Sequence, residues 1–356
     1  MHTDYLRRRF EKCRGYSPVI FQTLSGAIAG AIKSKGAKEE RCNERILRPF
    51  LPCFFNPFLC TCVRAHISPF TMRIYKTAKA LRKALPKDKT IAYVPTMGAL
   101  HAGHTALIDA ALKLHDVVVA SIFVNPTQFN DEADLEAYPR TPKSDAALLK
   151  KHGCKYLYLP KVEDIYPDGT GRSAAEGIDF GPLTATMEGA NRPGHFDGVA
   201  QVVSRLLEIV QPTTLLLGQK DYQQVAVIRA MIQRLDIPVA VHVVPTVRAK
   251  DGLALSSRNK RLNNKERAAA GTINVQLAAV AAGLKAGWPV EVLEQLALSG
   301  IGQNDLLDPE YVQIFDGDTL LPYLDGDNVR ELVVATAVKC GSVRLIDNRI
   351  VGSQNP

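Results

Sequence analysis

The chain has 356 residues, of which 46% are hydrophobic and 22% are charged. At roughly 100–200 residues per domain, this length allows about two domains, and the ordinary composition excludes a chain that is disordered throughout. The formal net charge of +8 would by itself indicate a nucleic acid or a membrane surface as partner.

That charge is concentrated at one end of the chain. Residues 1–71 carry 12 basic and 5 acidic side chains, whereas residues 72–356 carry 32 and 31. We therefore expect residues 1–71 to be an unstructured or accessory extension, and the near-neutral body to bind neither nucleic acid nor membrane. Only Cys154 and Cys340 follow residue 72; this excludes a disulfide framework and favours a reducing, cytoplasmic location.

From residue 72 onward, short apolar segments alternate with segments of helical spacing. Strands are predicted over 91–95, 117–124, 156–159, 214–217 and 239–244, and helices over 104–114, 145–152, 199–210 and 222–235. Such alternation predicts βαβ units and a parallel sheet, which binds ligands beyond the C-terminal ends of its strands.

The pattern changes after about residue 248. Helices are predicted over 265–285 and 289–298, and strands over 311–315, 332–338 and 344–347. The predicted fold class is therefore α/β, with a Rossmann-like parallel-sheet domain over residues 72–248. A smaller α+β domain, expected to act as a lid, follows over residues 249–356.

The first motif, Pro95-Thr-Met-Gly-Ala-Leu-His-Ala-Gly-His104, follows the first predicted strand and opens the first predicted helix. A helix N-terminus presents unpaired N–H groups and a partial positive charge, and it therefore attracts phosphate. His101 and His104 share one helical face, where two imidazoles can donate hydrogen bonds to a phosphate chain. Gly103 lets a ligand approach the backbone closely. The motif predicts a nucleotide-phosphate site, although two histidines beside a turn would by themselves fit an ordinary surface.

Two loop motifs carry polar groups suited to a small substrate. Asn125-Pro-Thr-Gln-Phe129 follows the second predicted strand, and Gln128 offers both a donor and an acceptor for hydroxyls and a carboxylate. Arg192-Pro-Gly-His-Phe-Asp-Gly-Val199 precedes a predicted helix. Within it, His195 fits a site-wall role and a loop-organising role equally.

The last two motifs carry positive charge. Gly218-Gln-Lys-Asp-Tyr-Gln-Gln224 follows the fourth predicted strand, and Lys220 supplies a mobile charge for phosphate. Val247-Arg-Ala-Lys-Asp-Gly-Leu-Ala-Leu-Ser-Ser-Arg258 ends in two hydroxyls and a guanidinium on one short loop. Such a set can bind the β- and γ-phosphates of a nucleotide and stabilise leaving pyrophosphate.

The first motif resembles the H-x-G-H signature of the nucleotidyltransferase superfamily. In order and spacing, the five motifs together resemble the pantoate–β-alanine ligase family from residue 72 to about residue 350. The resemblance implies that His104, His101, Lys220 and Arg258 are the catalytic residues. It implies ATP binding by Met97, Gly98, Ala99, Leu100, His101, Ala102, Gly103, His104, Gly218, Gln219, Lys220, Asp221, Val247, Leu255, Ser256, Ser257 and Arg258. It assigns Gln128 and Gln224 to the substrates pantoate and β-alanine.

The resemblance also implies a reaction. Pantoate is adenylated by ATP with release of pyrophosphate, and β-alanine then displaces AMP to give pantothenate. Mg²⁺ is expected with ATP. The sequence pattern indicates no dedicated set of metal ligands, and Asp145 is only a candidate metal neighbour. Family members are typically homodimers, and the same is expected here.

Three alternatives remain open from the residues. The first is another H-x-G-H enzyme, such as an adenylyl- or cytidylyltransferase, against which Gln128 and Gln224 argue. The second is a fragment of an aminoacyl-tRNA synthetase, which the near-neutral body disfavours because it lacks a basic RNA surface. The third is a non-enzymatic nucleotide-binding protein, which the charged motif residues disfavour.

Overall fold

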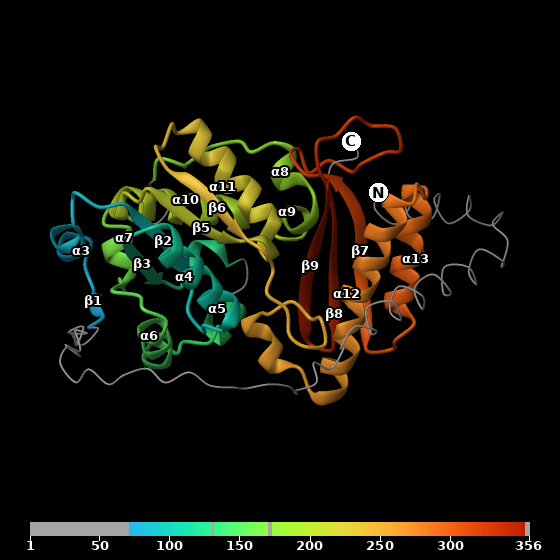
Figure 1. The fold of residues 1–356 in the computed structure, drawn as a ribbon, viewed down its shortest axis with the longest axis horizontal. Coiled ribbons are helices and arrows are strands. Elements are labelled where there is room, and N and C mark those ends of the chain that lie inside the picture. Colours follow the sequence, from blue (N-terminus) through green and yellow to red (C-terminus); the bar gives the residue numbers. More distant parts are fainter. Residues whose placement is uncertain (1–70, 130–131, 170–172, 353–356) are drawn as a thin grey trace, which may run out of the picture. The chain divides into compact units, whose positions relative to one another are not determined.

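The computed structural model describes residues 71–129, 132–169 and 173–352. Its larger sheet has six parallel strands in the order β1-β4-β3-β2-β5-β6 (Figure 1). The strands are β1 (Arg73–Tyr75), β2 (Ile91–Thr96), β3 (Val117–Ile122), β4 (Tyr156–Tyr158), β5 (Thr214–Gly218) and β6 (Ala240–Val244). The expected extension over residues 1–71 lies outside the described residues, apart from Thr71.

Buried side chains alternate along the central strands between the two faces of this sheet. In β2, Tyr93 lies in one apolar cluster, whereas Val94 lies in another. The side chains of β3 and β5 divide in the same way, as expected for strands with successive side chains on opposite faces. Because fully burying a large apolar side chain contributes roughly 1.5–3 kcal/mol, burial on both faces fixes the register of these strands.

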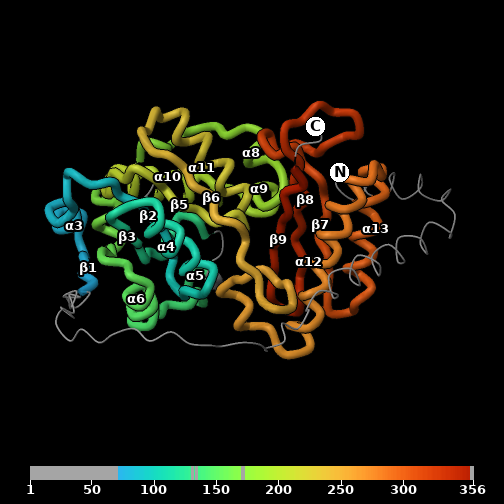
Figure 2. The backbone as a smooth tube through the Cα atoms, in the orientation of Figure 1, coloured from blue at the N-terminus to red at the C-terminus, as the bar shows by residue number. Residues whose placement is uncertain are grey.

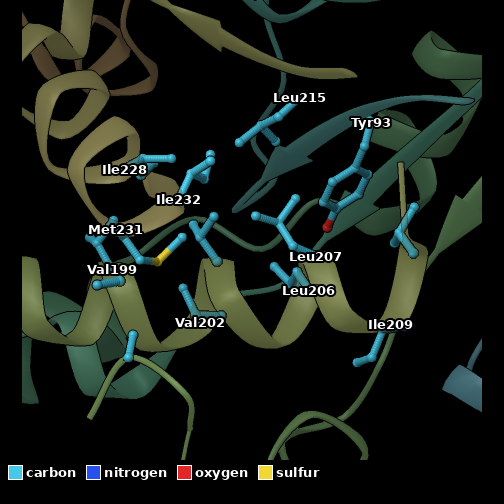
Figure 3. Close-up of a cluster of buried hydrophobic side chains, with 14 of the residues drawn as sticks. Tyr93, Val199, Val202, Leu206, Leu207, Ile209, Leu215, Ile228, Met231 and Ile232 are labelled. Atoms are coloured by element: carbon cyan, nitrogen blue, oxygen red, sulfur yellow. The ribbon is translucent and has the colours of Figure 1, made fainter. Parts of the chain in front are cut away.

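Helices cover both faces. One cluster packs the sheet against α10 (His195–Val210) and α11 (Tyr222–Arg234). Figure 3 shows side chains of these helices filling the space beside Tyr93 and Leu215. The opposite cluster packs the sheet against α4 (Ala102–Leu114) and α6 (Pro142–Lys151).

The chain beyond residue 249 forms a second sheet with its own core. Strands β7 (Leu307–Asp316), β8 (Leu332–Cys340) and β9 (Val343–Gly352) are antiparallel in the order β7-β8-β9. Helices α12 (Asn264–Lys285) and α13 (Val290–Gly302) pack on one face through a separate apolar cluster.

The other face of the small sheet contacts the first part of the body. Phe315, Val333 and Ala335 cluster with Met187 and Ala226, which belong to α9 (Met187–Asn191) and α11. Figure 2 traces β9 running beside this region. This contact brings β9 close to the strand-end loops of the parallel sheet.

The predicted fold class is confirmed, and the structure adds short elements that the pattern does not reveal. These are the strand β1, the helices α3 (Ala78–Ala84), α5 (Glu132–Ala137), α7 (Val162–Ile165), α8 (Pro182–Ala185) and α9, and the 3-10 helices η2 (Pro126–Gln128), η3 (Gln219–Asp221) and η4 (Ser257–Arg261). None of the helices in the described ranges is long and apolar enough to span a membrane.

Candidate active site

One buried carboxylate shapes the loop between β2 and α4. Asp145, in α6, accepts backbone hydrogen bonds from Ala99 N–H over 3.0 Å and from Leu100 N–H over 2.9 Å. Gly98 and Ala99 have φ values of +89° and +51°, a left-handed conformation that glycine adopts most readily. A Cβ atom on Gly98 would lie 3.1 Å from the Asp145 carboxylate. Asp145, a candidate metal neighbour on sequence grounds, thus holds the backbone of the loop between β2 and α4 in place.

The two motif histidines cap the N-terminus of α4 reciprocally. Nδ1 of His101 accepts a hydrogen bond from Gly103 N–H over 3.1 Å, and Nδ1 of His104 accepts one from His101 N–H over 3.2 Å. A neutral imidazole whose Nδ1 accepts carries its proton on Nε2. Both rings therefore offer Nε2–H as a donor, with ring centroids 4.2 Å apart.

The surroundings keep both histidines neutral. Burial, with smaller contributions from His104 and Lys220, lowers the pKa of His101 to about 3. Burial also lowers the pKa of His104 to about 4; the charge of Asp221 opposes this shift and that of Lys220 adds to it. Lys220 Nζ lies 3.5 Å from Asp221 Oδ1. The first and fourth motifs thus act on one another electrostatically.

Gln128 joins the second motif to the first. It is buried in η2, and its Nε2 donates to the sulfur of Met97 over 2.7 Å. Asn125 Nδ2 donates to Gln128 Oε1 over 3.4 Å and to the carbonyl of Gly198, at the start of α10, over 3.1 Å. The Gln128 side chain is therefore held in a fixed position between β2 and α10.

His195 organises the same loop from the other side. Its Nδ1–H donates to the carbonyl of Gln128 over 2.7 Å, and its Nε2 faces Arg192 Nη1 at 3.3 Å. Burial, with a smaller contribution from the charge of Arg192, lowers the pKa of His195 to about 4. His195 also lines a cleft with Lys220. Both roles that the sequence left open are therefore compatible with its position.

Two clefts are lined in part by predicted site residues, but neither is lined by His101, His104 or Ser256–Arg258. The first cleft lies between the two sheets and is lined by His195, Lys220, Asp221, Gln224, Thr336 and Asn348, among others. The second cleft lies beyond the ends of β2, β3 and β4 and is lined by Met97 and Gly98, among others. Gln128 contacts Met97 of the second cleft and His195 of the first, and so links the two.

The fifth motif lies beside the start of α4. Leu255 N–H donates to the Val247 carbonyl over 3.0 Å, and this closes the loop between them. Ser256 caps η4, where its Oγ accepts from Arg258 N–H over 3.3 Å. The Cβ of Leu255 lies 3.9 Å from the position a Cβ would take on Gly103. The histidine motif and the serine–arginine loop are therefore neighbours.

Sequence reasoning missed a buried polar cluster on β9. Asp347 forms a bidentate ion pair with Arg248, in which Nη1 and Nη2 of the arginine donate to Oδ2 and Oδ1 over 2.6 and 2.9 Å. Asn348 Nδ2 donates to the carbonyls of Gln219 and Lys220 over 3.1 and 2.7 Å. Polar residues at buried strand positions were the available signal, but the contacts join residues about 100 or more positions apart.

A second set of missed contacts lies near the start of β9. Arg344 forms ion pairs with Glu188 of α9 and with Glu310 of β7, the latter at 2.8 Å. Nothing in the local pattern around these residues predicts their contact. Like Asp347 and Asn348, Arg344 joins the small sheet to the first part of the body.

Comparison with known proteins gives consistent matches over the body. The family model for pantoate–β-alanine ligase matches residues 71–350. A pantothenate synthetase of Porphyromonas gingivalis is 44% identical over 281 residues, which cover 78% of this chain and 98% of that protein. One from Pseudomonas aeruginosa is 45% identical over 285 residues, with the same coverages.

Solved structures agree. A pantothenate synthetase from Thermus thermophilus superposes with a TM-score of 0.74 at 42% identity, over 79% of this chain and 100% of that one. A pantoate–β-alanine ligase from Francisella tularensis, complexed with beta-gamma ATP and β-alanine, gives a TM-score of 0.64 at 35% identity, over 79% and 98%.

Proposed function

Because the chain belongs to the pantoate–β-alanine ligase family, we propose that it makes pantothenate from (R)-pantoate and β-alanine through a pantoyl adenylate. In the first step the pantoate carboxylate attacks the α-phosphorus of ATP, and the bond to the leaving pyrophosphate breaks. In the second, the β-alanine amine attacks the acyl carbon and AMP leaves. The ATP and β-alanine bound by the F. tularensis relative support both as substrates.

The observation that carries this proposal is the pair of neutral imidazoles at the start of α4. With Nδ1 of His101 and His104 accepting from the backbone, each ring keeps an Nε2–H donor for phosphate oxygens. A neutral donor stabilises charge that develops on departing pyrophosphate without needing to be protonated first. The N-terminus of α4 adds a partial positive charge at the same point.

Positive charge completes the phosphate site. We propose that Lys220 contacts the phosphate chain, because its charge already lowers the pKa of both histidines. Ser256, Ser257 and Arg258 would bind the β- and γ-phosphates, since their loop lies beside Gly103. Such a site acts by positioning and charge neutralisation, and it needs no covalent nucleophile.

The glutamines provide for the acid substrate. Gln128 is held by Met97 and Asn125, and Gln224 lines the cleft that contains Lys220. We propose that these two amides bind pantoate through its hydroxyls and carboxylate, with β-alanine entering beside Gln128. The remaining predicted residues would contact ATP mainly through backbone: Gly98, Ala99, Leu100, Ala102, Gly218, Gln219, Asp221, Val247 and Leu255.

Mg²⁺ is proposed to enter with ATP. Among the residues that the structure describes, no three His, Cys, Asp or Glu side chains cluster in a way that would hold a metal ion, and Asp145 is occupied by backbone N–H groups. When bound through the phosphates, Mg²⁺ would neutralise their charge.

We also propose a division of the body near residue 248. The apolar cluster of the small sheet is separate from the two clusters of the parallel sheet. Residues 249–356 would then act as a lid that brings Ser256–Arg258 onto ATP. We propose a homodimer on the family resemblance and a cytoplasmic location on the two distant cysteines, Cys154 and Cys340; light scattering of the purified chain and fractionation of cells test them.

The decisive test uses the full chain. AMP release should require pantoate and β-alanine together, whereas exchange of pyrophosphate into ATP should require pantoate alone. Exchange that pantoate does not stimulate would contradict the adenylate step. ATP binding without AMP production would indicate a non-enzymatic nucleotide-binding protein instead.

A further inference from the structure

One side chain of the small sheet is bonded directly to the loop that carries Lys220. Asn348, in β9, is 3% exposed. Its Nδ2 donates to the Lys220 carbonyl over 2.7 Å and to the Gln219 carbonyl over 3.1 Å. Its Oδ1 accepts from Gln219 Nε2 over 3.3 Å. Both amide protons and the amide oxygen of Asn348 are thus used on two consecutive residues.

The backbone of Asn348 is itself held by a buried ion pair. Its N–H donates to Asp347 Oδ1 over 2.8 Å, and its carbonyl accepts from Arg248 Nη2 over 3.3 Å. Arg248 also donates to the Gly252 carbonyl over 3.2 Å, inside the loop that ends at Arg258. Through Asn348 and Arg248, β9 therefore touches the lysine loop and the base of the serine–arginine loop.

The bonding pattern indicates a role beyond packing. A buried carbonyl can be satisfied by any nearby donor, and an apolar contact would hold the two sheets together equally well. Here the planar side-chain amide of Asn348 donates hydrogen bonds to two successive carbonyls of η3. This short helix contains Lys220 and leads into α11. That arrangement restricts the backbone from which the Lys220 side chain extends.

We propose that Asn348 is a positioning residue, which acts through Lys220 by holding the backbone of η3 in the orientation that brings the ammonium group to the nucleotide phosphates. This inference rests on the proposed function, since it takes the adenylation of pantoate as the reaction. The amide does not itself touch substrate. Its effect on the reaction should therefore disappear when the Lys220 side chain is absent.

A double-mutant cycle on pantoate-dependent ATP–pyrophosphate exchange tests this in the full chain. Asn348→Ala is expected to lower the rate at saturating substrates about 10-fold in the parent chain, because η3 loses all three hydrogen bonds to this side chain. In the Lys220→Ala background the same change is expected to alter the rate less than about 2-fold. A full 10-fold loss in both backgrounds would overturn the proposal.

Arg344→Gln is the matched control. It removes the ion pair between Arg344 of the same strand and Glu188 of α9, and Arg344 makes no contact with η3 that is comparable to that of Asn348. Whatever fold-loss Arg344→Gln produces should be equal with and without the Lys220 side chain. If the fold-loss caused by Arg344→Gln instead vanished in the Lys220→Ala background, any broken contact of β9 would have the same effect as Asn348→Ala. No specific role for Asn348 would then remain.

A second variant covers poor folding of Asn348→Ala. Asn348→Ser removes both amide N–H donors without adding a charge, so it should also lower exchange about 10-fold; normal exchange would overturn the proposal. A parent chain that shows no pantoate-stimulated exchange would contradict the proposed function instead. The two failures are thereby told apart.

Discussion

The strand-end loops of the parallel sheet and the strand β9 of the small sheet both contribute to the candidate site, but in different ways. The loops present donors and charges outward, at His101, His104 and Lys220. Strand β9 presents side chains that are buried and satisfied within the protein, at Asp347 and Asn348. The first region binds phosphate in our proposal, and the second holds the first in shape.

This difference separates activity from stability. Removing a phosphate donor should lower the rate of the reaction much more than the stability of the fold, whereas removing a buried partner leaves a polar group buried and unpaired. The two regions also differ in the sequence separation of the residues that contact one another. His101 and His104 are three residues apart, but Arg248 and Asp347 are 99 apart.

The largest effect is expected from breaking the buried ion pair. Arg248→Met leaves the Asp347 carboxylate, 2% exposed, without its cation, which should lower the free energy of unfolding by about 3–5 kcal/mol. The matched control is Arg267→Met, which breaks the more exposed pair with Asp251 at 3.0 Å and should cost no more than about 1 kcal/mol. Urea unfolding of both variants measures the difference. Equal losses would remove the distinction between the two regions.

The next effect is on chemistry. His104→Ala or Lys220→Ala should lower pantoate-dependent adenylate formation at least about 100-fold, or roughly 2.7 kcal/mol of transition-state stabilisation. The loss of the His104 cap should cost only about 1 kcal/mol of stability. His152→Ala, which removes an exposed partner of Asp109, serves as control and should keep parent activity. Near-normal turnover in either site variant would remove that residue from the mechanism.

Much of the fold and the outline of the site follow from the sequence. Apolar periodicity predicts the central strands and the long helices, because these elements are buried on defined faces. The three-residue strand β1 and the short helices α7, α8 and α9 are too short to show a period. Their formation depends on tertiary contacts such as the hydrogen bond from Gln223 Nε2 to the carbonyl of Thr186, the C-cap residue of α8.

Some features of the candidate site can likewise be predicted from the sequence, and others cannot. Sequence predicts the histidines and Lys220 because their motifs follow strand ends. It does not predict the reciprocal cap that sets the tautomers of His101 and His104, since that depends on backbone geometry. Nor does it predict Asn348, because the partners of this residue lie more than 120 positions away.

A smaller effect is expected where a helix meets a strand-end loop. A Cβ atom on Gly198 would lie 2.4 Å from the Thr127 carbonyl oxygen, and backbone cannot yield as a flexible side chain would. Gly198→Ala should therefore cost about 1–3 kcal/mol of stability and raise the KM for pantoate, because the displaced segment carries Gln128.

Gly302→Ala is the matched control for that substitution. The nearest atoms to its added methyl group belong to Pro309 and lie 3.9 Å away, so the methyl group fits without displacement. Stability should stay the same or rise slightly, since glycine weakens a helix. Thermal melting and pantoate titrations compare the two variants. An unchanged KM in Gly198→Ala would mean that the loop carrying Gln128 has no part in binding pantoate.

The smallest effect is expected from a change of pH, because three histidines should stay neutral over the range in which a histidine ordinarily titrates. The pKa values of His101, His104 and His195 are lowered to about 3, 4 and 4, whereas an unfolded histidine titrates near 6.5. Between these values the unfolded chain binds more protons, so the stabilising contribution is complete above pH 6.5 and is lost as the pH falls toward 4.

Nitrogen-15 spectra of the folded chain test both the pKa values and the tautomers. The three rings should give constant signals from pH 8 to 5.5, with the proton on Nε2 in His101 and His104 and on Nδ1 in His195. The difference arises because the first two rings accept backbone hydrogen bonds at Nδ1, whereas His195 donates from Nδ1 to the Gln128 carbonyl. A midpoint near pH 6.5 for His101 or His104 would mean that the ring binds phosphate as a cation. The helix cap would then have to open, because protonated Nδ1 cannot accept a hydrogen bond.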